Sequence, residues 1–333
     1  MAITFHNYKD APAADDLVRR FDLDIEEVCG GFATPALFHG NRKFSGALHR
    51  ADGDLVVRSQ RLVERGGFKP IDPERATPPG EGEAELVPGT SIYLGLMFST
   101  FGHFLVESIA RFWALTDFRE GGVRFVFHPW RGLDPKPLLE AGHVARALER
   151  FGIGTDDLVF CLKRPVRFER ILVPDQSWRI NRSAHPVFGD LYERAFAHRG
   201  PVARAGGRLY LSRARWRRPR GSVNEREAEA LFGKRGFEIV YPEEVSFAEL
   251  TERVAGAETV AGCDGSAMHV AGLRRGGRVI LVDSRNVRNQ LIIDRLMDLD
   301  AHHVWARCEG DDLPDRKWRI DIDAVAAALD RIL

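Results

Sequence analysis

Three short segments of the sequence carry residues whose types and spacing could do chemistry. The first begins at Gly102, and within it His103, Glu107 and Arg111 recur at intervals of four residues. Residues spaced in this way share one face of an α-helix, and a carboxylate beside a histidine is the equipment of a general base. A simple ion pair between Glu107 and Arg111 on a surface helix would give the same spacing, so both interpretations remain open.

The second segment follows an expected strand, 208–211, and starts with Ser212 and Arg213. An arginine just past a strand end can hold a diphosphate with its planar fork of N–H donors. Asn224 and Glu225 then begin an expected helix. Further arginines lie between, at Arg215, Arg217, Arg218 and Arg220. A solvated basic loop would also be rich in arginine, and so would a nucleic-acid patch, although Trp216 is the only aromatic residue within the run.

The third segment is a turn of small residues between an expected strand and an expected helix. It reads Asp264, Gly265, Ser266 and Ala267, with His269 one turn later. The free N–H groups and the dipole of a helix N-terminus suit a phosphate. Gly-Ser is also common in ordinary turns that precede a helix and bind no ligand. Neither a GxGxxG motif nor a P-loop motif is present.

The elements that must position these segments are those of an α/β protein. The length of 333 residues favours two domains. We expect a first domain over 1–200, in which residues 1–98 are irregular and β-leaning, and a second, Rossmann-like domain over 201–333. In the first domain we expect helices over 101–115, 135–151 and 186–198. In the second, strands at 208–211, 238–240, 258–261 and 278–282 alternate with helices of about 10–12 residues, which is typical of parallel βαβ units.

Composition excludes several classes of protein. Lys and Arg number 48, Asp and Glu also number 48, and the formal net charge is therefore zero, which disfavours a globally basic nucleic-acid binder. No apolar run approaches the ~18–20 residues of a membrane span. The first residues lack a signal-peptide layout, and the four cysteines include no CxxC pair. We therefore expect a cytoplasmic protein without a metal site. If a metal is used, Asp311 and Asp312, or Asp264, are the places where it would bind.

Together the three segments resemble glycosyltransferase family 61, which includes bacterial proteins of capsular polysaccharide biosynthesis. The family motif H-x-x-x-[DE]-x-x-x-R matches His103, Glu107 and Arg111. The family also has a strand ending in Ser-Arg, an Asn-Glu helix start, an H-G-A-G-hydrophobic turn and a strand ending in an acidic residue. In this chain they match 211–213, 224–225, 264–267 and Asp283, and the resemblance covers about residues 90–300.

The resemblance implies a GT-B architecture, in which two Rossmann-like domains face a cleft, and inversion at the anomeric carbon. Glu107 would be the catalytic base, with His103 as its orienting neighbour or the alternate base, and Arg111 would lie on the acceptor side. The implied donor-binding residues are Arg213, Asn224, Glu225, Asp264, Gly265, Ser266, Ala267, His269 and Asp283. Asp264 stands where the family has histidine, so either His269 substitutes for it or the donor head group differs.

The resemblance further implies a nucleotide-sugar donor, with a UDP-sugar expected, and a glycan or polysaccharide acceptor. No cofactor, metal or nucleic acid is expected, and any association with a membrane assembly would be peripheral. Two alternatives stay open. One is a sugar-nucleotide epimerase or hydrolase on the same fold, and the other is a non-catalytic polyanion or nucleic-acid binder that uses the arginines after residue 212.

Overall fold

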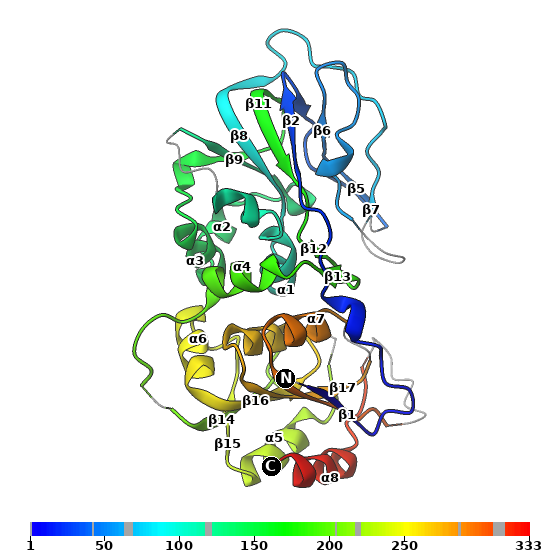
Figure 1. The fold of residues 1–333 in the computed structure, drawn as a ribbon, viewed down its shortest axis with the longest axis vertical. Coiled ribbons are helices and arrows are strands. Elements are labelled where there is room, and N and C mark those ends of the chain that lie inside the picture. Colours follow the sequence, from blue (N-terminus) through cyan, green and yellow to red (C-terminus); the bar gives the residue numbers. More distant parts are fainter. Residues whose placement is uncertain are drawn as a thin grey trace. The chain divides into compact units, whose positions relative to one another are not determined.

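The computed structural model describes residues 2–41, 43–62, 69–116, 122–203, 205–216, 221–285, 288–308 and 317–333. Its internal contacts divide the chain into two compact units (Figure 1). Unit 1 consists of Met1–Val18 and Phe196–Leu333, and unit 2 consists of Arg19–Ala195. Both have parallel strands and helices, so the expectation of a mixed α/β protein is confirmed. Among the described residues, no helix has the length and apolar character needed to cross a bilayer.

The first residues of the chain belong to the unit that holds its C-terminal half. Strand β1 (Ile3–His6) pairs in parallel with β18 (Asp300–Trp305), at the edge of the unit 1 sheet. The expected first domain, 1–200, includes residues 1–18. That assignment is wrong for this segment, because nothing local in four strand residues tells which sheet they will join.

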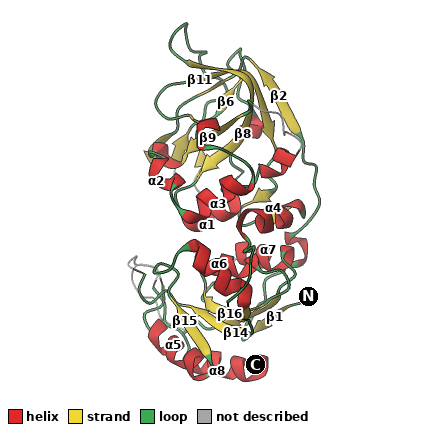
Figure 2. Cartoon of the chain, turned by 90° about the vertical axis from the view of Figure 1, so that its left-hand side faces the viewer, coloured by secondary structure: helices red, strands yellow, loops and turns green. Residues whose placement is uncertain are grey.

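Unit 1 is an α/β sandwich built on a six-stranded parallel sheet (Figure 2). In spatial order its strands are β1, β18, β17 (Arg278–Asp283), β16 (Ala257–Cys263), β14 (Gly207–Leu211) and β15 (Phe237–Val240). One face carries α5 (Glu225–Lys234) and α8 (Ile322–Ile332), and the other carries α6 (Phe247–Gly256) and α7 (Arg288–Leu296). Because both faces are covered, the strands are continuous apolar runs such as Val279–Val282. The remaining helices are 3-10 helices, Asp15–Leu17 and Ser266–Leu273.

Unit 2 is built on a mixed sheet of seven strands. Its order is β10 (Leu158–Phe160), β9 (Arg124–Pro129), β8 (Glu85–Met97), β11 (Val166–Pro174), β3 (Phe32–Ala33) and β6 (Leu48–His49), and β2 (Ile25–Cys29) also pairs with β11. The first four strands run parallel, and β2 and β3 run antiparallel to β11. Two small sheets complete the unit, one of β4 (Leu37–Gly40), β5 (Lys43–Ser45) and β7 (Lys69–Pro70), the other of β12 (Trp178–Arg179) and β13 (Ser183–Ala184).

The helices of unit 2 are shorter than the sequence suggests. They are α1 (Phe101–His103), α2 (Lys136–Leu139), α3 (Gly142–Arg150) and α4 (Val187–Phe196), with 3-10 helices at Val57–Ser59, Phe112–Thr116, Trp130–Gly132 and Thr155–Asp157. The single helix expected over 101–115 is wrong. After α1 the chain widens into a π-helical turn, Phe104–Ser108, and helical geometry ends at Ile109.

Strand order marks one ligand-binding position in each unit. In unit 1, β15 lies on one side of β14, and the strand that follows β15 in the chain, β16, lies on the other side. In unit 2, β9 and β10 lie on one side of β8, and β11 lies on the other side. In open parallel sheets, ligands bind outside the carboxyl ends of the strands where the order reverses. The predicted site residues follow β8 in unit 2 and β14 and β16 in unit 1.

Candidate functional site

In unit 2, a histidine, a glutamate and an arginine meet just beyond the carboxyl end of β8. His103 ends α1, and its Nδ1 lies 2.5 Å from Oε1 of Glu107. The Arg61 guanidinium donates from Nε to Oε2 of the same carboxylate at 2.6 Å and from a terminal nitrogen to Oε1 at 2.9 Å. The side chains of Arg61 and Glu107 are only 4% and 5% exposed, whereas that of His103 is 42% exposed. Only the histidine can therefore meet a substrate directly.

The charges around Glu107 keep this carboxylate ionised, and the ionised carboxylate determines which His103 nitrogen can donate to it. Burial disfavours the carboxylate, but the Arg61 guanidinium and the His103 hydrogen bond hold the pKa of Glu107 below its ordinary value. An ionised carboxylate can only accept hydrogen bonds. Nδ1 of His103 must therefore carry the proton, which leaves the Nε2 lone pair of a neutral ring free to accept one. This is the arrangement of an oriented general base.

The turn that carries Glu107 is fastened to β8 by local contacts. Ser108 donates its hydroxyl to the carbonyl of Leu96 and accepts the N–H of Phe98, both at 3.0 Å. The Phe98 ring then stacks on the His103 ring, with centroids 5.1 Å apart and planes 25° apart. The Arg61 guanidinium lies 5.2 Å from the same Phe98 ring. These contacts limit the orientations open to the imidazole.

Arg111 does not share the face of His103 and Glu107. Its guanidinium donates to the carbonyl of Pro174 at 2.9 Å and to that of Arg58 at 2.8 Å, and it is 1% exposed. It thereby ties the chain after β8 to the end of β11. The expected helix face of three residues is wrong for Arg111, because the π-helical turn changes the number of residues per turn. The expected Glu107–Arg111 ion pair is replaced by Glu107–Arg61.

A pocket of about 460 Å³ opens at the same edge of the unit 2 sheet. Its lining includes Met97 and Pro129, which end β8 and β9, together with Trp130 and His143. The Trp130 ring lies 4.8 Å from that of Phe98. Phe98 therefore contacts both His103 and Trp130, a residue of the pocket lining.

In unit 1, the segments after β14 and β16 meet at the predicted switch point. A terminal nitrogen of Arg213 donates to the carbonyl of Asp264 at 2.8 Å. Gly265 has φ 154° and ψ 171°, a conformation essentially restricted to glycine. A Cβ atom there would lie 2.4 Å from the Arg213 guanidinium. Glycine thus leaves room for the arginine at this turn, and the 3-10 helix begins at the next residue, Ser266.

The two residues at the start of α5 differ in role. Glu225 is 4% exposed and accepts the backbone N–H of Arg213 at 2.7 Å, and burial raises its pKa to about 7. Asn224 accepts the backbone N–H of Ile320 at 2.8 Å and donates to the carbonyl of Ile320 at 3.1 Å. Glu225 therefore belongs to the Arg213 cluster, whereas the Asn224 amide holds the segment that leads into α8.

Asp264, which replaces the family histidine, has its carboxylate already paired. Oδ2 accepts the Ser284 hydroxyl and Nε of Arg285, both at 3.0 Å. The Arg285 side chain is 66% exposed, so the aspartate brings a second accessible arginine to this edge of the sheet. His269 is 7% exposed, and its Nδ1 lies 2.9 Å from the side-chain oxygen of Gln290.

Asp283 lies in a buried network rather than on the open edge. Its Oδ2 accepts the Tyr8 hydroxyl and Nδ1 of His303, the latter at 2.8 Å, and it is 0% exposed. The other His303 nitrogen donates to Asp294 at 2.8 Å. Burial opposes a charged ring, but hydrogen bonds and charges from both carboxylates raise the pKa of His303 to about 10. Asp283 thus holds unit 1 together, and Gln290 links Asp294 to His269.

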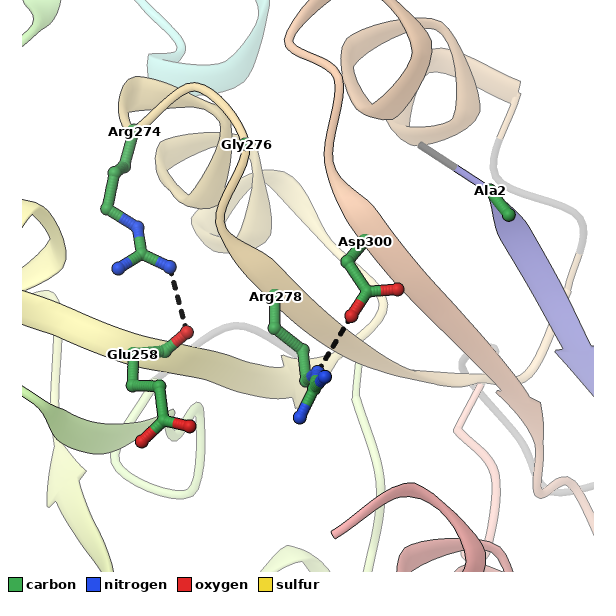
Figure 3. Close-up of a pocket in the computed structure, with 6 residues that line it drawn as sticks. All are labelled: Ala2, Glu258, Arg274, Gly276, Arg278 and Asp300. Atoms are coloured by element: carbon green, nitrogen blue, oxygen red, sulfur yellow. Dashed lines mark hydrogen bonds and ion pairs between the residues drawn. The ribbon is translucent and has the colours of Figure 1, made fainter.

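The opposite edge of the unit 1 sheet carries another pocket, of about 480 Å³ (Figure 3). Arg278 there pairs with Asp300 at 2.8 Å, and Arg274 donates to the carbonyl of Glu258 at 2.8 Å. These residues lie at the amino ends of β16, β17 and β18, away from the edge where parallel sheets bind ligands. Among the described residues, no group of three or more His, Cys, Asp or Glu could hold a metal ion.

The arginine run after β14 is only partly described. Arg215 pairs with Glu244 at 2.6 Å and lies 3.8 Å from the Tyr241 ring centroid, so it belongs to the fold of the unit. Arg217, Arg218 and Arg220 lie outside the described residues, as do Asp311 and Asp312.

Sequence reasoning missed three residues of these sites. Arg61 and Tyr8 come from the irregular first ninety residues and have no motif around them. Arg285 could have been found, because it follows β17 at the carboxyl edge of the sheet.

A comparison with protein-family models matches residues 101–281 to the family described as Glycosyltransferase 61. The match covers more than half of the chain, begins at α1 and extends into β17. It therefore contains His103, Glu107, Arg213 and the turn at Gly265, all four of which the geometry singles out. No curated protein is significantly similar to the chain in sequence.

Proposed function

We propose that the donor of this enzyme is a nucleotide-sugar, expected to be a UDP-sugar. The chain belongs to glycosyltransferase family 61, and it is therefore a glycosyltransferase with a sugar donor and an acceptor. The acceptor is a glycan or polysaccharide hydroxyl, and the anomeric carbon inverts. Unit 2 binds the acceptor and unit 1 the donor, as in a GT-B enzyme. The observation that carries this proposal is the exposed His103 held by the buried, ionised Glu107.

In this mechanism His103, rather than Glu107, is the base. The acceptor oxygen attacks the anomeric carbon from the side opposite the diphosphate, while its proton passes to Nε2 of His103. The bond from the anomeric carbon to the phosphate oxygen breaks, and its electron pair leaves with the nucleoside diphosphate. Glu107 keeps the ring in the tautomer that can accept the proton and stabilises the imidazolium that forms. The roles expected for the two residues are thus exchanged.

The donor diphosphate is assigned to the edge of unit 1 where β14 and β16 end. Arg213, Arg285 and the N–H groups at the start of the 3-10 helix would stabilise the leaving charge. The negative charge of Asp264 would repel the diphosphate, but its ion pair with Arg285 offsets this repulsion. Burial raises the pKa of Glu225 to about 7, so this carboxyl group carries less than a full negative charge beside the diphosphate at neutral pH. With these cationic groups the mechanism needs no metal.

The test is a transfer assay with a panel of nucleotide-sugars and glycan acceptors. Release of nucleoside diphosphate should require both substrates and should fall about 10²–10⁴-fold in His103→Gln. The control is His39→Gln, an exposed histidine on β4 of the same unit. Donor turnover without an acceptor would instead identify an epimerase or hydrolase, and affinity that collapses with salt would identify a polyanion binder.

A further inference from the structure

The pocket lined by Trp130 and His143 is linked to His103 through Phe98, and its lining restricts what it can bind. It lies at the carboxyl ends of β8 and β9, and its volume of about 460 Å³ falls within the ~300–1,000 Å³ range of small-molecule sites. Phe98 connects it to the proposed base, because its ring stacks on His103 and also lies 4.8 Å from Trp130. On the other side, Phe101 of α1 lies 5.0 Å from His143 of the pocket.

The lining of this pocket is almost entirely uncharged. Of its eleven residues only Ser99, Asp134 and His143 are polar. Burial lowers the pKa of His143 to about 4, so its ring is neutral at physiological pH. Asp134 is then the only formal charge, and it repels anions. The nucleoside diphosphate therefore does not belong here.

The apolar lining extends out to the rim. Leu133 is 51% exposed and lies in the lining, where it offers apolar surface to an occupant. The backbone before it is held in an uncommon conformation, with Arg131 at φ 59° and Gly132 at φ 63°. The left-handed conformation costs free energy at Arg131, which is not glycine, and such strained residues cluster at ligand sites. Trp130 and Leu133, on either side of these two residues in sequence, both line the pocket.

We propose that this pocket is an acceptor subsite that binds an apolar group, an alkyl, acyl or aromatic substituent, joined to the sugar whose hydroxyl faces His103. The inference rests on the proposed function for the direction of transfer. It goes further by naming the substrate class, an acceptor glycoside with an apolar aglycone. A bare polysaccharide chain would bury less apolar area against this lining than an apolar aglycone does.

The test compares methyl β-D-glucopyranoside with n-octyl β-D-glucopyranoside, kept below its micelle-forming concentration, as probes titrated by ligand-observed NMR. Burial of only two methylene groups raises affinity about tenfold, so the octyl glucoside should bind at least that much more tightly. Leu133→Asp puts a charge on the rim and should abolish the preference. Leu86→Asp, on a leucine that is 62% exposed on β8 and outside the lining, is the matched control and should retain it.

Equal binding of the two glucosides would overturn the inference and indicate a polar sugar subsite. A preference that survives Leu133→Asp would overturn it too, since the alkyl chain would then bind elsewhere. The titration needs neither donor nor turnover. A chain that transfers sugar without preferring the octyl glucoside refutes the apolar subsite alone. A chain that prefers it but transfers no sugar retains an apolar binding site, but it refutes the proposed function and with it the assignment of the site to an acceptor.

Discussion

Glu107→Gln separates the two possible bases, because the amide keeps the size of the carboxylate while changing what it can bond. The carboxylate accepts from Arg61 through both oxygens and from Nδ1 of His103. An amide has one oxygen, which Arg61 would claim, and its NH₂ group would then face Nδ1. Nδ1 would have to accept, and the proton would move to Nε2, the tautomer that cannot take a proton from the acceptor. We expect kcat to fall about 10²–10⁴-fold.

The same substitution also destabilises unit 2. Arg61 would keep its charge with a side chain only 4% exposed. Removing one partner of a buried ion pair typically costs about 3–5 kcal/mol. The double variant Arg61→Gln, Glu107→Gln removes the stranded charge and should recover some of the unfolding free energy without recovering activity. His103→Gln, at a 42% exposed side chain, should change stability by no more than about 0.5 kcal/mol yet lose a similar factor in rate.

The assay is nucleoside diphosphate release at saturating acceptor, run beside thermal unfolding and nucleotide binding for each variant. If His103→Gln transfers sugar at a near-normal rate while folded Glu107→Gln does not, Glu107 is the base and the exchange of roles is wrong. If both variants turn over normally, His103 and Glu107 have no catalytic role, and the function of Glu107 is to form the ion pair with Arg61.

Three further predictions concern unit 1. Arg213→Ala should weaken nucleoside diphosphate binding by about 1.5–3 kcal/mol, the worth of hydrogen bonds to charged groups; Arg215→Ala is the control, and unchanged affinity would remove Arg213 from the site. Sugar transfer should persist in EDTA, because arginines and helix N–H groups would stabilise the leaving diphosphate. If EDTA abolishes the activity and magnesium or manganese restores it, the mechanism uses a metal. Folded His303 keeps its proton up to about pH 10, whereas an unfolded histidine loses it near 6.5. Stability should therefore be full below about pH 6.5 and fall by about 1.4 kcal/mol per pH unit between these values, as denaturant unfolding at several pH values can measure. A wild-type slope equal to that of His303→Gln would contradict the role of this histidine.

Regular elements of unit 1 follow closely from the sequence. The expected strand 208–211 is β14, Gly207–Leu211, and 278–282 is β17, Arg278–Asp283. These are short apolar runs bounded by glycine or polar residues, and each pairs with neighbours in a parallel sheet that buries both faces. The motifs at their carboxyl ends could be placed because the topology of such sheets is restricted.

The helix after β8 shows where periodicity fails. Phe104, Leu105 and Val106 are consecutive and all buried, with exposed fractions of 0–1%. A pattern of apolar residues reports which side chains are buried but not how many residues make a turn. The π-helical turn keeps His103 beside Glu107 and sends Arg111 toward β11. Arg61, 46 residues before Glu107 in the chain, could only be found once the fold was known.

The N-terminal segment belongs to unit 1, to which the proposed donor site is assigned. Strand β1 adds an edge to the unit 1 sheet, and Tyr8 donates its hydroxyl to Asp283, the carboxylate that also binds His303. A cut at residue 200, where the sequence suggests a domain boundary, would expose the edge of β18 and leave Asp283 without the tyrosine. Loss of the pairing with β18 and of one hydrogen bond to the buried Asp283 carboxylate would both destabilise the sheet. The chain therefore passes between the two units twice, near residues 18 and 195. A fragment that is to contain the whole of unit 1 must include both 1–18 and 196–333.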